Sequence, residues 1–113
     1  MPEFAADAET YKWLMVTWDE SLDWDEWNSK KLAKHNLTVQ QIEGLFDGDF
    51  IFGGKLVEPK GAGWGEDRFL IFGEIAERRL VTVVWTKRDA KIRPITCRSM
   101  QDGEKKYYQQ ENE

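Results

Sequence analysis

The spacing of apolar residues predicts a helix over residues 24–35. An aspartate at its start, Asp23 or Asp25, can accept hydrogen bonds from the first unpaired backbone N–H groups. The predicted buried face holds four residues at roughly helical spacing: Trp24, Trp27, Lys31 and Leu32. Asn36 follows as a residue that tolerates the left-handed conformation in which many helices end.

A second helix is predicted immediately afterwards, because two start signals coincide. Thr38 and Gln41 have the spacing of a capping box. Leu37 and Ile42 can pack against each other across the helix start. Apolar residues at positions 39, 42, 45 and 46 form the stripe that should face the core, and the Asp-Gly-Asp sequence at 47–49 ends the helix.

The second half of the chain has the pattern of an antiparallel sheet. Four segments are rich in apolar and β-branched residues and predict strands: 50–57, 68–75, 80–86 and 91–97. A glycine-rich loop at 59–65 separates the first two, and the later links are short enough for hairpins. Ser99 can cap a last helix that runs to about Gln110, and residues 11–18 are a candidate extra edge strand.

The order of elements predicts an α+β fold. Two N-terminal helices precede an antiparallel sheet of three or four strands, or five with the extra edge strand, and a C-terminal helix packs on it. A chain of 113 residues has room for one core, so we expect a single domain over 1–113. Residues 1–10 and 109–113 lack an apolar pattern and are expected to be flexible.

The charge is unevenly distributed. The net charge of −5 argues against a nucleic-acid partner, but residues 68–98 hold eight bases and three acids. That segment can present a positive face, or its charges can simply solvate strand edges and turns. The single Cys97, set among apolar residues, is expected to be a core residue in a reducing cytoplasm.

Some classes of protein are not expected. No apolar run is long enough to span a membrane, and no secretion signal is visible at the N-terminus. With one histidine and one cysteine, a dedicated zinc site is not expected, nor is any other metal or cofactor.

Three blocks of sequence, in their order and spacing, resemble the BrnT toxin family. The blocks span residues 24–28 with 34–38, residues 66–73, and residues 92–100 followed by Glu104 and Tyr108. The resemblance implies a RelE-like fold and a ribonuclease toxin of a type II toxin–antitoxin system. It also implies two partners, an RNA substrate and a cognate antitoxin with which the chain would form a hetero-oligomer.

A metal-independent ribonuclease of this kind must stabilise a dianionic phosphorane, and arginine suits that task because its planar fork pairs two phosphate oxygens. Arg68, Arg93 and Arg98 are therefore the candidate catalytic arginines. Strand alternation places Arg93 and Arg98 on opposite faces unless a bulge near Pro94 re-aims one of them. Arg68 can equally form a structural ion pair with Glu66.

Other residues could transfer protons or bind RNA. Glu66 and Tyr108 join the arginines as candidate catalytic residues, and Lys34, His35 and Trp64 are candidate RNA-binding residues. Each has a structural alternative. His35 can satisfy carbonyls at a helix end, Lys34 can be a solvated lysine, and Trp64 can fold back on the core.

Two other functions remain open. Pro94, inside the strand that carries two of the arginines, and the acidic balance are consistent with an inactive RelE-fold module that only binds a protein. Non-catalytic RNA binding through the basic strands is the third possibility, and it predicts steep salt dependence without product.

Overall fold

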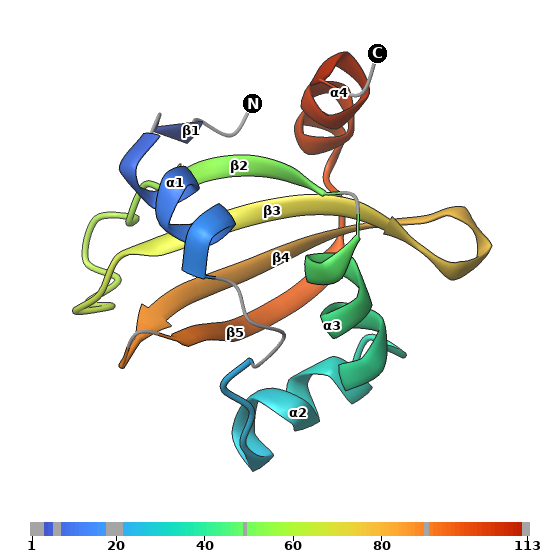
Figure 1. The fold of residues 1–113 in the computed structure, drawn as a ribbon, viewed down its shortest axis with the longest axis horizontal. Helices are drawn as coiled ribbons and strands as arrows, with labels where there is room; N and C mark the ends of the chain where they lie inside the picture. The colour runs from blue at the N-terminus through green and yellow to red at the C-terminus, as the bar shows by residue number, and fades with distance from the viewer. Residues whose placement is uncertain (1–3, 6–7, 18–21, 49, 90, 112–113) are drawn as a thin grey trace.

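A five-stranded antiparallel sheet, in the order β1-β2-β3-β4-β5, forms the centre of the molecule (Figure 1). The computed structural model describes residues 4–5, 8–17, 22–48, 50–89 and 91–111. The strands are β1 Phe4–Ala5, β2 Ile51–Leu56, β3 Arg68–Ile75, β4 Arg79–Arg88 and β5 Lys91–Ser99. Neighbours in the sheet are neighbours in the chain, so the four long strands form a meander.

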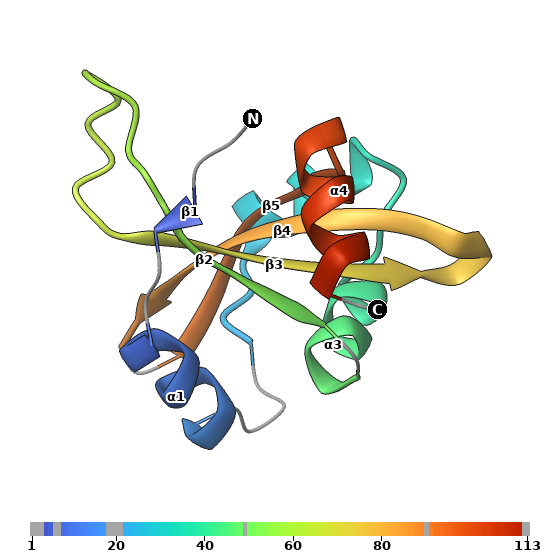
Figure 2. The same cartoon turned by 90° about the horizontal axis from the view of Figure 1, so that it is seen from above.

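Helices lie on both sides of this sheet. They are α1 Ala8–Thr17, α2 Glu26–Ala33, α3 Val39–Asp47 and α4 Asp102–Glu111. Figure 2 shows α1 and α3 on one side of the sheet and α4 on the other. The α2 helix lies beside the edge strand β5, where Leu22 makes a parallel bridge with Ile92. The architecture is therefore α+β, with four antiparallel strands following helices and a C-terminal helix packed on the sheet, as predicted.

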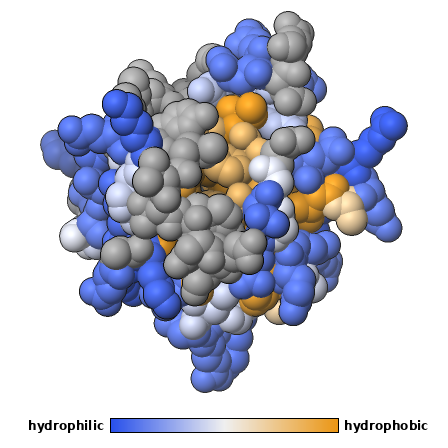
Figure 3. All heavy atoms as spheres, viewed as in Figure 1, coloured by the Kyte–Doolittle hydropathy of each residue, from blue (hydrophilic) through white to orange (hydrophobic). Residues whose placement is uncertain are grey.

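Two apolar layers hold the helices on the sheet. The layer under α1 and α3 is centred on Trp85, which is fully buried and stacks on Trp13 at 6.3 Å between ring centroids. The thinner layer under α4 includes Leu70, Phe72 and Val84. Apolar side chains also gather near the centre of the face in Figure 3, with hydrophilic ones around them.

The N-terminal region differs from the sequence prediction. The strand expected at 11–18 is wrong, because α1 covers Ala8–Thr17; Trp18 lies outside the described residues. Three helices therefore precede the long strands instead of two, and the fifth strand is Phe4–Ala5. The buried Thr10 and Leu14 are one helical turn apart, a spacing that the run of apolar residues from Trp13 onward concealed.

The two predicted helix starts are confirmed. Asp25 caps α2 and forms a capping box with Asn28, and Thr38 forms the predicted one with Gln41. Asn36 has the expected positive φ of 57°. The last helix begins at Asp102 rather than directly after Ser99, because the Met100 N–H still bonds the Leu80 carbonyl at 3.2 Å and extends the sheet.

The two ends of the chain are described in part. Flexible ends were expected at residues 1–10 and 109–113. Of these, residues 1–3, 6–7 and 112–113 lie outside the described residues. In the ranges that are described, no helix has the length and apolarity needed to cross a membrane.

Candidate active site

A bulge in β5 brings Arg93 and Arg98 to the same face of the sheet. Arg93 pairs with Thr86 of β4, and Arg98 pairs with Thr82. The two threonines are four residues apart on β4, so they point to one side. Their partners are five residues apart because Ile95 is an extra, unpaired residue at the register shift. The opposite-face arrangement expected from simple alternation is therefore avoided.

Arg68 shares that face. Every second side chain along β3 points to the same side, so Arg68 lies on the side of Leu70 and Phe72. The side chains of Leu70 and Phe72 form the layer under α4. The register continues from Phe69 opposite Trp85, which sets Arg68 beside Thr86 of β4, and Thr86 in turn pairs with Arg93, so Arg68 and Arg93 are two strands apart with Thr86 between them. All three candidate arginines thus lie on the α4 side of the sheet. Arg68 and Arg93 lie near one end, and Arg98 lies four positions further along.

Pro94 has no backbone N–H to donate, so it fits only at a sheet edge or a bulge. Both conditions are met, because β5 is an edge strand and Pro94 immediately precedes the bulge. Its carbonyl accepts a hydrogen bond from the Asn28 amide at 2.9 Å. The same amide bonds the Asp23 carbonyl at 2.9 Å, and the Asp23 N–H bonds the Ile92 carbonyl at 2.9 Å. The start of α2 is therefore fastened to the bulged segment.

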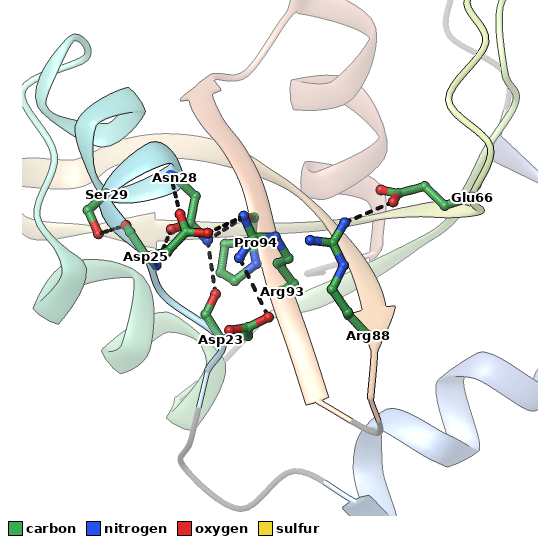
Figure 4. A network of polar contacts seen from close by, with 8 residues as sticks. All are labelled: Asp23, Asp25, Asn28, Ser29, Glu66, Arg88, Arg93 and Pro94. Carbon is green, nitrogen blue, oxygen red and sulfur yellow. Dashed lines mark hydrogen bonds and ion pairs between the residues drawn. The ribbon is translucent and has the colours of Figure 1, made fainter.

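Arg93 is buried in an acidic clamp (Figure 4). Its side chain is 7% exposed, and its Nη2 lies 2.7 Å from Asp25 Oδ2, while Nη1 lies 3.5 Å from Asp23 Oδ2. The Asn28 N–H and then the Arg93 guanidinium hold the pKa of Asp25 below its ordinary value. The Arg93 Nε is buried without a hydrogen-bond partner.

Arg98 is engaged by a buried carboxylate on α4. Its two terminal nitrogens lie 2.6 and 2.9 Å from the oxygens of Glu104, a residue that is 1% exposed. Thr82 and the Gln101 N–H also donate to this carboxylate, at 3.0 and 2.8 Å. Burial acts to raise the pKa of Glu104, but the bonds from Arg98, Gln101 and Thr82 outweigh it and hold that pKa below its ordinary value. This network fastens α4 to the sheet.

Arg68 has weaker partners than the other two arginines. Its Nε lies 3.6 Å from Glu66 Oε2 and is buried without a hydrogen bond. Its guanidinium carbon lies 4.6 Å from the centre of the Trp64 ring. Glu66 instead lies closer to Arg88, with 3.1 Å between Oε1 and Nη2 (Figure 4). Among the described residues, no side-chain hydrogen bond engages the Arg68 guanidinium, so its terminal N–H groups can bind another acceptor.

Lys31 adds a positive charge that the sequence analysis placed in a buried helix face. Burial, then the charges of Arg68 and Lys34, lower the pKa of Lys31. Its Nζ lies 3.9 Å from the centre of the Trp27 ring, and Trp27 is 50% exposed instead of buried as predicted. We call Lys31, Arg68, Arg88 and Arg93 the basic patch. In the sequence, the position of Lys31 one turn after a tryptophan pointed to the helix face and not to this patch.

The remaining predicted residues lie elsewhere. Tyr108 lines a different pocket, with Gln41, Gly48 and Ile75, at the opposite end of the sheet. The His35 backbone carbonyl accepts a hydrogen bond from Arg79 at 2.7 Å, and its side chain is on the exposed link between α2 and α3. Lys34 is exposed and near enough to Lys31 to affect its titration. Cys97 is a buried core residue as predicted, and burial raises its pKa to about 12.

Comparison with known proteins identifies the family of the chain. None of the curated proteins matches the chain. The family model described as the ribonuclease toxin BrnT of a type II toxin–antitoxin system matches residues 24–104. The matched region runs from α2 through strands β2 to β5 to Glu104 and contains every residue of the basic patch. Since it covers more than two thirds of the 113 residues, the chain belongs to the BrnT family of ribonuclease toxins.

Proposed function

We propose that this chain is a metal-independent endoribonuclease toxin that binds the scissile phosphate of RNA at the basic patch. The observation that carries the proposal is the row across β3 and β5 formed by Arg68 and Arg93, whose buried Nε groups find no hydrogen-bond partner among the described residues. A third cation, Lys31, has a pKa lowered by burial and then by the charge of Arg68. Such a gathering of cations favours an anionic ligand.

In the proposed reaction the ribose 2′-oxygen attacks phosphorus, the bond to the 5′-oxygen breaks, and a 2′,3′-cyclic phosphate forms. Arg68 binds the phosphorane oxygens, and Arg93 supports it from β5, across the intervening strand β4. Glu66 accepts the proton from the 2′-hydroxyl. Lys31, whose proton is held less tightly than that of a solvated lysine, protonates the leaving 5′-oxygen.

The other candidates take supporting parts in this proposal. Lys34 contacts a neighbouring phosphate, and Trp64 stacks on a base. His35 lies away from the basic patch, because Arg79, which binds its carbonyl, pairs with Ile75 at the other end of the sheet. Arg98 and Tyr108 are structural in this proposal and hold α4 on the sheet. They are not placed in the reaction, because Arg98 is already bound to Glu104 and Tyr108 lies at the other end of the sheet.

We further infer that residues 1–113 form one domain of the RelE-like type. The antiparallel meander of four long strands and the C-terminal helix packed on it support this inference, and α1 is an N-terminal helix beyond the two expected. The toxin would act in the cytoplasm and be held inactive in a hetero-oligomer with its antitoxin, the partner that a type II system implies.

A catalytically inactive protein-binding module is the second candidate. It is favoured by the ion pairs that Arg93 and Arg98 already form with carboxylates of the chain. In this case the arginines would be structural, and the chain would bind its partner without cutting RNA.

Incubation with single-stranded RNA and excess EDTA tests the proposal. We expect undiminished cleavage and products that end in 2′,3′-cyclic phosphate, because guanidinium groups take the place of a metal. Cleavage that stops with EDTA and returns with Mg²⁺ would refute metal independence. A purified, folded protein that leaves RNA intact in both buffers would support the protein-binding module.

A further inference from the structure

A cavity beside the basic patch has the features of a base-binding pocket. Its volume is about 670 Å³, within the range of roughly 300 to 1000 Å³ that is usual for small-ligand sites. The end of β2 and the loop between β2 and β3 form its wall. The lining residues that matter here are Lys55, Glu58, Trp64, Glu66 and Asp67.

Trp64 connects the cavity to the proposed phosphate site. The Arg68 guanidinium lies over the indole ring at 4.6 Å from its centre, and the same tryptophan lines the cavity, whereas Arg68 does not. A base that stacks on the indole from the cavity would therefore be separated from Arg68, the proposed phosphate-binding residue, by the indole ring alone. Stacking on an aromatic side chain accepts any base and gives no base preference by itself.

The carboxylates of the cavity supply the preference. Asp67 is paired with Lys55 at 3.1 Å, and Glu66 is paired with Arg88 at 3.1 Å. Glu58 differs: its Oε1 accepts the Trp64 backbone N–H at 2.8 Å, and no lysine or arginine of the described ranges forms an ion pair with it. The hydrogen bond from the Trp64 N–H thus holds the Glu58 carboxylate beside the Trp64 ring, without an ion-pair partner among the described residues.

We propose that this cavity binds guanine in single-stranded RNA, with Trp64 as the stacking surface and Glu58 as the residue that selects the base. A carboxylate only accepts hydrogen bonds. Guanine presents two adjacent donors, N1–H and N2–H, whereas adenine and cytosine present one donor next to an acceptor. Uracil presents its single donor between two carbonyl oxygens, which a carboxylate repels. The inference rests on the proposed nuclease function and specifies its substrate.

Calorimetric titration of the full chain with the four nucleoside 3′-monophosphates tests the selection. Guanosine 3′-monophosphate should bind about 10-fold more tightly than the other three, the discrimination expected of one bidentate contact. Glu58→Gln replaces an acceptor by a donor of the same shape and should remove that advantage. Glu77→Gln, at the far turn between β3 and β4, is the matched control and should keep it.

The outcomes separate this inference from the nuclease proposal. Equal binding of all four nucleotides, or a guanine preference that survives Glu58→Gln in a folded protein, would overturn the guanine pocket. RNA cleavage without preference at guanine would overturn the pocket and leave the nuclease intact. Guanine-selective binding by a protein that does not cut RNA would support the pocket and refute the nuclease.

Discussion

Replacing Arg68 with alanine is expected to slow RNA cleavage by about 100- to 1000-fold, the usual cost of losing one preorganised donor to a developing anion. Arg68 has the most distant acidic partner of the three arginines among the described residues, 3.6 Å away, so we expect its terminal N–H groups to bind the phosphorane. Arg68→Lys should recover little of the rate, because an ammonium group cannot reproduce the two parallel N–H bonds. Single-turnover cleavage of a labelled RNA measures both variants.

Arg78→Ala is the matched control for this variant. Arg78 is exposed in the turn after β3, and its positive φ of 59° strains alanine as much as arginine. This control should cut RNA at the rate of the unmodified protein. If folded Arg68→Ala protein kept more than half of that rate, Arg68 would have no catalytic role.

Glu104→Ala is expected to lower the free energy of unfolding by about 3 kcal/mol, the low end of the cost of breaking a buried ion pair. The substitution removes the acceptor for Arg98, Thr82 and the Gln101 N–H at once. Urea denaturation measures the loss. Glu111→Ala, an exposed change on the same helix, should alter stability by less than about 0.5 kcal/mol.

The stability contributed by Glu104 should also depend on pH. Its pKa is lower in the folded chain than the ordinary 4.5, so the contribution is complete above that pH and is lost as the pH falls through the folded value. Glu104→Gln should therefore be less stable than the unmodified protein at pH 7, with the difference shrinking below about pH 4.5. A difference that stays constant down to pH 2 would show that the Glu104 charge does not hold α4.

Local signals in the sequence were sufficient for much of the fold. Capping residues such as Asp25 and Thr38 act within one helical turn, so their spacing alone located two helix starts. The helix at Ala8–Thr17 was missed because its compact run of apolar residues fits a strand as well as a helix. Only packing against Trp85 distinguishes the two.

The candidate site was harder to predict because its geometry depends on contacts between distant segments. The sequence suggested a bulge near Pro94, but only the register with β4 shows that it aligns Arg93 with Arg98. The partners of these arginines come from α2 and α4, and no spacing rule identifies Asp25 or Glu104 as those partners. Tertiary packing, not local sequence, decides which arginine stays available.

The most direct test of the proposed site is to map where RNA binds. Amide chemical shifts can be followed by NMR as the protein is titrated with a 2′-O-methyl RNA oligonucleotide, which lacks the attacking hydroxyl and stays intact. We predict that the largest shifts fall on residues 64–68, 86–88 and 91–93 and on the Trp27–Lys31 turn of α2. Shifts centred instead on Gln41, Gly48 and Tyr108, at the other end of the sheet, would contradict the assignment of the basic patch as the phosphate site.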